Sequence, residues 1–144
     1  MKRKILVAYD GSDLSHEALN EAKLQAKGVP ETEVYVLAVV TQAGPATNAT
    51  AASSFEKEIA DKFHTKMEKI KSDFEQSNIT VYTDVTIDVD KRNAGEQICS
   101  YALEHQADLI IVGSRGLGDV KKLFLGSVSN RVVELSQCPV LIIK

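Results

Sequence analysis

The sequence predicts an α/β fold, a three-layer sandwich in which helices cover both faces of a five-stranded parallel sheet. Five short runs rich in β-branched residues alternate with segments of helical periodicity, and this alternation is typical of βαβ units. Most of the runs are continuously apolar, as expected of strands that are buried on both faces. The 144 residues suffice for one core, so we expect a single domain over residues 1–144.

Each predicted strand corresponds to one of these apolar runs. The strands are expected at residues 5–9, 34–40, 80–87, 109–112 and 140–143. The run 80–87 alternates between apolar and polar residues more than the others, which indicates a strand with one solvated face. We therefore expect this strand at an edge of the sheet.

Four helices are predicted, at residues 13–27, 54–76 and 95–105, with a fourth that starts near Ser127. Ser12 is a suitable N-cap for the first helix, and Gly28 and Pro30 end it. Apolar residues at helical spacing predict the buried faces, so the aromatic residues of the second helix are interpreted as core. The buried faces are expected to hold Leu14, Ala18, Leu19, Ala22 and Ala26; Phe55, Ile59, Phe63, Met67, Ile70 and Phe74; Ile98, Ala102 and one of Cys99 and Tyr101; and Val128, Val132 and Leu135.

Residues 41–53, with the sequence TQAGPATNATAAS, are small and polar. Such a segment buries little apolar surface, so we expect a mobile loop. It would leave the carboxyl end of a strand, which is where ligands bind in open α/β sheets. The sequence leaves two interpretations open, a lid over a ligand or a tolerated insertion.

Composition and charge argue against several classes of function. The net charge of −3 and the isoelectric point of about 5.6 argue against a nucleic-acid surface, which needs clustered Lys and Arg. The chain has no apolar stretch of roughly 18 residues, so no membrane span is expected. The apolar run that follows the basic start ends at Tyr9, too early for a signal peptide, so we expect a cytoplasmic protein. Cys99 and Cys138 have no metal-ligand spacing and are interpreted as reduced, buried thiols.

The segment from Gly113 to Ser127 carries the chemistry of the chain. Gly113 follows an apolar strand, Gly116 comes three residues later, and after nine more residues Gly126 and Ser127 open a helix. Glycines let backbone N–H groups approach a phosphate, and a helix N-terminus adds unpaired N–H groups and positive potential. The string is neither a Walker A loop nor the Gly-x-Gly-x-x-Gly fingerprint. Spacing alone leaves two interpretations open: an anion cradle, or glycines that only make turns.

The chain resembles the universal stress protein family. Gly-x-x-Gly-x9-Gly-Ser is the ATP-binding signature of that family, and Gly113, Gly116, Gly126 and Ser127 match it in full. The similarity runs over essentially the whole chain. It is carried further by the first strand and loop ILVAYDGS (residues 5–12), the fourth strand and turn ADLIIVGSRG (residues 107–116) and the last strand CPVLII (residues 138–143).

The resemblance implies an ATP site, with Mg²⁺ or Mn²⁺ bound through the phosphates. Asp10 would meet the ribose hydroxyls or that metal, although capping the following turn is the alternative role. Val39 would hydrogen-bond adenine through its backbone, and Arg115 would reach a phosphate unless it is simply solvated. The residues implied to bind the nucleotide are Ala8, Asp10, Val39, Gly113, Arg115, Gly116, Gly126, Ser127, Val128 and Ser129.

The resemblance also implies the strand order 3-2-1-4-5 of a Rossmann-like sheet and a homodimer through the last strand, residues 139–144. An apolar edge strand that pairs with its twin is covered from solvent, so this mode of dimerisation is physically reasonable. One departure concerns the third helix. Many relatives have Pro after the Gly that opens it, whereas this chain has Asn93-Ala94-Gly95-Glu96 and so lacks that marker of the helix start.

The sequence leaves three functions open. The first is an ATP-binding regulatory protein of the stress response. The second is a slow ATPase, or an enzyme that phosphorylates itself at Ser127 or Ser129; the sequence offers no convincing general base for it, because His16, His64 and His105 are scattered. The third is a dimeric interaction scaffold without nucleotide, whose expected mark is a broken glycine motif that this chain does not show.

Overall fold

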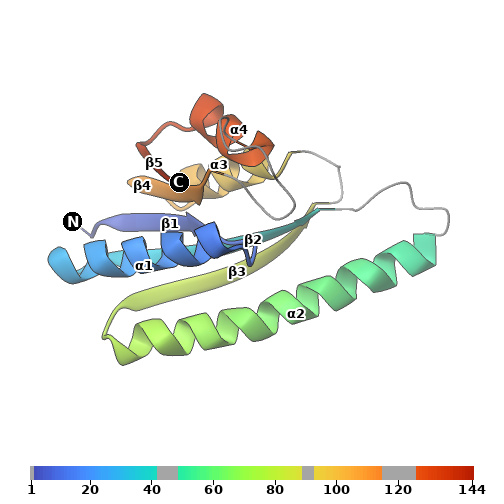
Figure 1. The fold of residues 1–144 in the computed structure, drawn as a ribbon, viewed down its shortest axis with the longest axis horizontal. Coiled ribbons are helices and arrows are strands. Elements are labelled where there is room, and N and C mark those ends of the chain that lie inside the picture. Colours follow the sequence, from blue (N-terminus) through green and yellow to red (C-terminus); the bar gives the residue numbers. More distant parts are fainter. Residues whose placement is uncertain (1, 42–48, 89–92, 115–125) are drawn as a thin grey trace.

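The computed structural model describes residues 2–41, 49–88, 93–114 and 126–144 (Figure 1). For residues 41, 49–56 and 88 it describes the backbone alone. The elements are β1 (Lys4–Ala8), α1 (Asp13–Gly28), β2 (Glu33–Thr41), α2 (Ala49–Gln76), β3 (Thr80–Asp88), α3 (Ala94–Glu104), β4 (Leu109–Gly113), α4 (Ser127–Leu135) and β5 (Val140–Ile143).

The five strands form one parallel sheet in the order β3-β2-β1-β4-β5, which confirms the predicted order and the edge position of β3. β2 and β3 are the long pair, in register from Glu33↔Thr80 to Thr41↔Asp88. β1 lies at the centre of the sheet between β2 and β4, and it is much shorter than β2. Each predicted strand agrees with the observed one to within a residue at either end.

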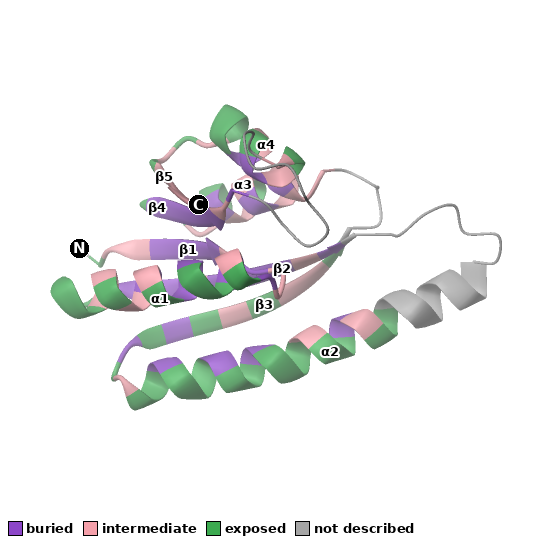
Figure 2. Cartoon of the chain, viewed as in Figure 1, coloured by how far each residue is buried: buried purple, intermediate pink, exposed green. Residues whose placement is uncertain are grey.

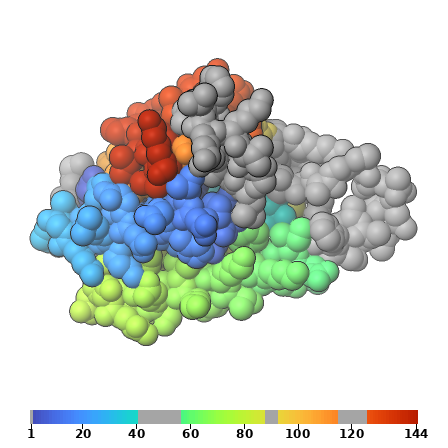
Figure 3. Space-filling view, in the orientation of Figure 1, coloured from blue at the N-terminus to red at the C-terminus, as the bar shows by residue number. Residues whose placement is uncertain are grey.

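Two helices cover each face of the sheet, as the three-layer prediction requires. On one face α1 and α2 lie side by side (Figure 3), and their apolar residues pack with those of the strands into one core cluster that includes Val7, Val36 and Ile111. On the other face α3 and α4 pack over Leu6, Leu37 and Ile110. Figure 2 shows buried residues along the central strands and on the sheet-facing sides of the helices.

The helix α2 begins at Ala49, five residues before the predicted start at residue 54. The prediction of a loop over residues 41–53 is therefore wrong at Thr41, which ends β2, and from Ala49 onward. Three of the first four helical residues are alanines, and alanine has the highest helix propensity, so these small residues extend the helix. The predicted apolar stripe is confirmed at Met67, Ile70 and Phe74, which are buried, whereas Ile59 and Phe63 are half-buried. Residues 42–48 and the Phe55 side chain lie outside the described residues.

The helix starts are explained by caps. Ser12 is the N-cap of α1, as predicted, and its Oγ accepts a hydrogen bond from the backbone N–H of Ser15 at 3.2 Å. Asn93 is the N-cap of α3, and its side chain accepts from the N–H of Gly95 at 2.7 Å. A side-chain cap thus starts α3, whose first turn contains no proline.

Two details of the predicted core need correction. Leu135 is 40% exposed because it is the last residue of α4 and lies at the rim of a surface pocket, whereas Val132 of the same helix is fully buried as predicted. Cys99 and Tyr101 are both half-buried against the core of their face, where one of them was expected to point inward. No helix in the described part of the chain combines the length and the apolarity that crossing a membrane requires.

Candidate functional site

Among the described residues the central strand β1 ends before β2 and β4 do, and this leaves a gap in the ladder of strands at the carboxyl edge of the sheet. β1 pairs with β2 up to Ala8↔Leu37 and with β4 up to Val7↔Ile111, whereas β2 continues to Thr41. Beyond β1, its two neighbours are separated by two strand spacings, roughly 9–10 Å. The chain leaves β1 for a helix on one face and leaves β4 for a helix on the other, so the gap is the topological switch point, where ligands bind in open α/β sheets.

Backbone groups of β2 and β4 point into this gap from opposite sides. The carbonyl oxygen of Leu37 accepts from the N–H of Tyr9 at 2.9 Å, so odd-numbered residues of β2 direct both backbone groups toward β1. Val39, two residues further, directs its groups the same way, past the end of β1. The N–H of Ser114 donates to Ile143 in β5 at 2.7 Å, so the neighbouring Gly113 directs its own groups toward β1.

The floor of the gap is the loop Asp10-Gly11-Ser12. One carboxylate oxygen of Asp10, Oδ1, accepts from the N–H of Ser12 at 2.9 Å, which realises the alternative role of capping the turn. A carboxylate has two oxygens, so this bond leaves Oδ2 for a ligand. Gly11 has a φ of 86°, a conformation that favours glycine. The capping and the ligand roles of Asp10 are therefore compatible.

The N-terminus of α4 is tied to the end of β4. The N–H of Gly126 donates to the carbonyl oxygen of Ser114 at 2.5 Å, and the Ser129 hydroxyl donates to the same oxygen at 2.9 Å. Gly126 is the N-cap and makes no side-chain cap bond, and the first turn of α4 has no acidic residue. The N–H groups of this turn have no partner within the helix, so they suit an anion.

The residues Ser127, Val128 and Ser129 of this turn differ in which groups they can present to a ligand. The Ser129 side chain is only 1% exposed, and its hydroxyl proton is shared between the carbonyl oxygens of Ser114 and Gly126. Ser127 is exposed, so its hydroxyl is accessible to a ligand. Val128 packs against the core beneath α3, which leaves its backbone N–H as its contribution.

The structure thus brings the described candidates to one edge of the sheet. Ala8, Asp10, Val39 and Gly113 surround the end of β1, and Gly126 to Ser129 begin α4 next to it. Arg115 and Gly116 lie outside the described residues. Their assignment to the site stays a prediction, as does the binding role of the other residues.

Sequence reasoning missed Lys66 of α2. An ideal Cβ placed on Gly11 would lie 3.3 Å from the Lys66 Nζ atom, so this ammonium reaches the loop at the end of β1. It also lies 5.5 Å from the centre of the Phe63 ring. No pattern in the sequence points to Lys66, because α2 carries charged residues on most of its solvent-facing positions.

Aromatic side chains support the loop from the α1 and α2 face. The Tyr9 ring makes edge contacts with His16 and Phe63, and the Tyr9 hydroxyl hydrogen-bonds His16 Nε2 at 3.3 Å. Burial raises the pKa of Tyr9, and the negative charge of Asp10 raises it further. His16 therefore has a structural partner. Among the described residues no three His, Cys, Asp or Glu side chains gather as a metal site.

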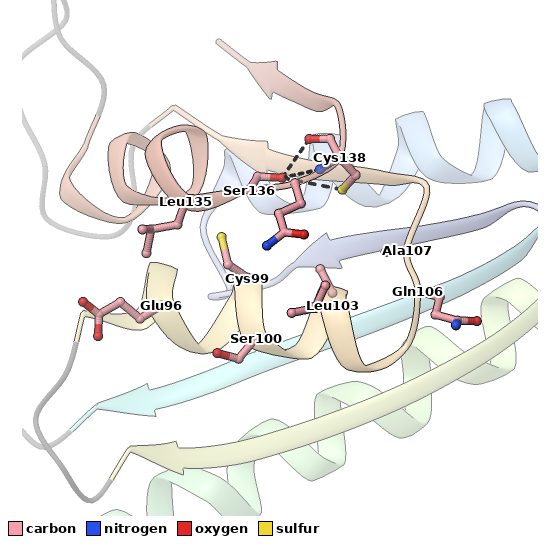
Figure 4. A pocket seen from close by; sticks show the side chains of 11 residues that line it. Glu96, Cys99, Ser100, Leu103, Gln106, Ala107, Leu135, Ser136 and Cys138 are labelled. Carbon is pink, nitrogen blue, oxygen red and sulfur yellow. Dashed lines mark hydrogen bonds between the residues drawn. The ribbon is translucent and has the colours of Figure 1, made fainter.

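A separate pocket lies between α3 and the turn that joins α4 to β5 (Figure 4). Its volume is about 590 Å³, and Cys99 and Cys138 both line it.

The prediction of buried thiols is wrong, because both cysteines are half-buried. Cys99 lies on α3 and Cys138 just before β5, and packing of α3 against α4 places the two in one pocket although they are far apart in sequence. Ser136 holds the turn, because its hydroxyl donates to the Cys138 carbonyl oxygen at 2.7 Å. This pocket is distinct from the gap at the end of β1.

The chain is similar to known proteins over its full length. The sequence profile of the universal stress protein family matches residues 1–144. The chain belongs to the universal stress protein family. The universal stress protein YxiE of Bacillus subtilis is 34% identical over 149 residues, which cover 100% of both chains. The solved structure of MJ0577, a universal stress protein of Methanocaldococcus jannaschii, is 29% identical, covers 99% of this chain and 95% of its own, and has a TM-score of 0.79.

Two more distant universal stress proteins with this fold were solved with nucleotides. One, from Archaeoglobus fulgidus, is in complex with dAMP; it is 24% identical, with a TM-score of 0.64, and covers 99% of this chain and 98% of its own. The other is in complex with cAMP; it is 20% identical, with a TM-score of 0.66, and covers 99% of this chain and 96% of its own. At these identities the likeness shows the shared fold.

Proposed function

We propose that this universal stress protein binds ATP at the end of β1 and acts as a cytoplasmic regulatory protein of the stress response. One observation carries the proposal: the backbone groups of Val39 and Gly113 face the gap beyond β1, and the N-terminus of α4 lies at its rim. Two proteins of the same fold bind adenine nucleotides, dAMP and cAMP, which supports the ligand class.

The adenine base fits the edge of β2. Its six-membered ring offers a ring-nitrogen acceptor beside an amino donor, and the N–H and C=O of one strand residue present the complementary pair. Val39 directs both groups into the gap, and β1 has already ended at Ala8, so the base would continue the ladder that β1 leaves. The free Asp10 oxygen would then accept from a ribose hydroxyl.

The phosphates fit the start of α4. A helix N-terminus carries partial positive charge on its unpaired N–H groups, and phosphate binds there without a Walker motif. Ser127 adds an exposed hydroxyl, while Ser129 holds the turn against β4. This site binds anions mainly through backbone groups, which is how a chain with a net charge of −3 would hold a triphosphate. Any Mg²⁺ or Mn²⁺ would be carried by the phosphates, with Asp10 as the protein oxygen within the gap.

We also propose a homodimer through β5, at the edge of the sheet. The carbonyl oxygens of Pro139 and Ile143 accept bonds from β4, so Val140 and Ile142 direct their backbone groups outward. Light scattering of an Ile142→Pro variant tests this, because proline removes one outward N–H and spares the bonds to β4. A folded variant with the dimer affinity of the wild type would exclude this interface.

ATP binding is tested by purifying the protein without added nucleotide and identifying released ligand by chromatography and mass spectrometry. The same protein is titrated with ATP, ADP, AMP and cAMP, with and without Mg²⁺. Gly126→Val places a branched side chain at the N-cap, beside the N–H groups of α4, and should abolish binding. Gly28→Val is the matched control, because an added Cβ at Gly28 meets no atom within 4 Å.

The results separate the functions. Binding of ATP by the wild type and by Gly28→Val, together with loss of binding in a folded Gly126→Val, would support the proposed ATP site. A regulatory role further requires that ATP change the conformation or the dimer equilibrium, since a ligand shifts an equilibrium only through different affinities for its two states. Accumulation of ADP in the wild type alone would indicate an ATPase. A folded wild type that binds no adenylate at millimolar concentration would overturn the proposal and favour the interaction scaffold.

A further inference from the structure

The Lys66 ammonium is the cation that the described contacts place at the end of β1. Its Nζ atom lies 3.3 Å from where a Cβ on Gly11 would stand, and Gly11 directly follows Asp10 in the chain, although Lys66 belongs to a helix on the α1 and α2 face. The ion pairs found among the described residues do not include Lys66. Its Nζ atom also lies 5.5 Å from the centre of the half-buried Phe63 ring, and because Lys66 itself is exposed, this cation–π contact is weak. The side chain is exposed, so the ammonium is able to turn toward a ligand.

A triphosphate in the gap would need a cation to offset its negative charge. Asp10 brings a carboxylate to the floor of the gap, and a bare phosphate beside it would be repelled. The α4 N-terminus offers about half a positive charge, which offsets only part of a triphosphate. An ammonium has three donors and no acceptor, so among the parts of a nucleotide it favours the phosphate oxygens. Lys66 therefore supplies charge that would otherwise have to come entirely from a metal ion.

We propose that Lys66 is a phosphate-binding residue, which reaches the gap from α2 and favours nucleotides with more phosphate charge. This inference rests on the proposed nucleotide function. The nucleotide would then be held from both faces of the sheet, by the start of α4 on one side and by Lys66 on the other. α2 thereby becomes part of the binding site.

The test compares ATP with adenosine, which has the same base and ribose and no phosphate. Affinities are measured by calorimetric titration in EDTA, so that no divalent cation replaces the ammonium. Lys66→Gln should weaken ATP binding about tenfold, the effect of losing one charged hydrogen bond, and should leave adenosine binding unchanged. Lys66→Arg keeps the charge and should retain most of the affinity for ATP. The ATP affinity of the wild type should also fall more steeply with salt than that of Lys66→Gln.

The matched control is Lys62→Gln. Lys62 lies one turn earlier on the same helix and forms an exposed ion pair with Glu58 at 3.9 Å, so its charge is not directed at the loop. This variant should bind ATP as the wild type does, and urea unfolding should show both variants to be folded.

Three outcomes would overturn the inference. If Lys66→Gln binds ATP as tightly as the wild type, or if it loses ATP and adenosine equally, Lys66 does not bind phosphate. If Lys62→Gln weakens ATP binding as much as Lys66→Gln, the effect is one of overall charge. In each of these cases the wild type still binds ATP, so the proposed function stands. If the wild type binds neither ATP nor adenosine, the proposed function is wrong, and the inference about Lys66 fails because it rests on that function.

Discussion

Gly95 of α3 lies so close to Arg131 of α4 that a Cβ on Gly95 would be 2.7 Å from the Cβ of Arg131. It would also lie 2.9 Å from the Val128 carbonyl oxygen in the first turn of α4. Glycine is thus required by the approach of the two helices. The ion pair between Arg131 and Glu96, at 2.7 Å, spans the same contact.

Gly95→Ala should destabilise the protein by roughly 1–3 kcal/mol, because overpacking forces the two helices apart. Gly28→Ala is the control, since its added methyl group meets open space, and we expect it to be neutral or slightly stabilising. Urea unfolding of the two variants measures the difference. Equal free energies of unfolding would show that the α3–α4 contact adjusts without cost.

Ser129→Ala should cost about 1–2 kcal/mol in the free energy of unfolding, because it removes a buried hydroxyl that donates to the Ser114 carbonyl oxygen. Ser127→Ala removes an exposed hydroxyl two residues earlier and should change stability by less than about 0.5 kcal/mol. Chemical denaturation distinguishes them. The reverse order would mean that the Ser129 bond does not hold α4 to β4.

Tyr101 should make stability fall at high pH. Burial raises the pKa of Tyr101 to about 12, and the charges of Asp84 and Glu104 contribute. The usual tyrosine value is 10.0, so above pH 10 the unfolded chain loses this proton first and stability declines as the pH rises toward 12. The side chain is only half-buried, so solvent screening limits the effect to about 1 kcal/mol.

The measurement for Tyr101 is urea unfolding at several values between pH 9 and pH 11.5, a range chosen around the usual tyrosine pKa. Tyr101→Phe should show a shallower decline than the wild type. Tyr9 and Tyr82, whose pKa values are also raised, remain in both proteins and contribute equally to the two curves. Parallel curves would contradict the prediction.

Asn93→Ala should destabilise the protein by about 1 kcal/mol, because it removes the side-chain cap on Gly95 at the start of α3. Asn93→Asp keeps an acceptor and should retain the stability. Asn20→Ala, at an exposed position inside α1, is the control and should be neutral or slightly stabilising. Thermal unfolding is sufficient here. If Asn20→Ala lowers the stability as much as Asn93→Ala does, the loss of the cap does not explain the destabilisation.

Local patterns predicted most of the fold, because hydrophobic periodicity and capping residues are properties of short segments. The edge position of β3 followed from the alternation in its sequence, and the Ser12 cap from its residue type. The early start of α2 was missed because Ala49 to Ala52 was interpreted by its polar neighbours, whereas alanine propensity extends the helix. The order of the strands needed the family resemblance, since periodicity does not say which strands are neighbours.

The candidate site was predictable only where the glycine pattern marks it. Asp10, Gly113 and Gly126 stand beside recognisable strand ends and a helix start, so their meeting at one edge follows from a parallel sheet. Lys66 reaches the same edge through the packing of α2, and Cys99 meets Cys138 in one pocket through the packing of α3 against α4. Contacts of this kind join residues that are distant in the chain, and a single sequence carries no local signal for them.

The short central strand makes the sheet itself incomplete. A ligand that bonds to Val39 would take the place of the next residues of β1, so part of the binding energy would be that of extending a β-ladder. Nucleotide affinity and sheet integrity would then depend on the same backbone groups. An insertion that lengthened β1 by two residues would fill the gap with protein, and the site would be lost while the fold was kept.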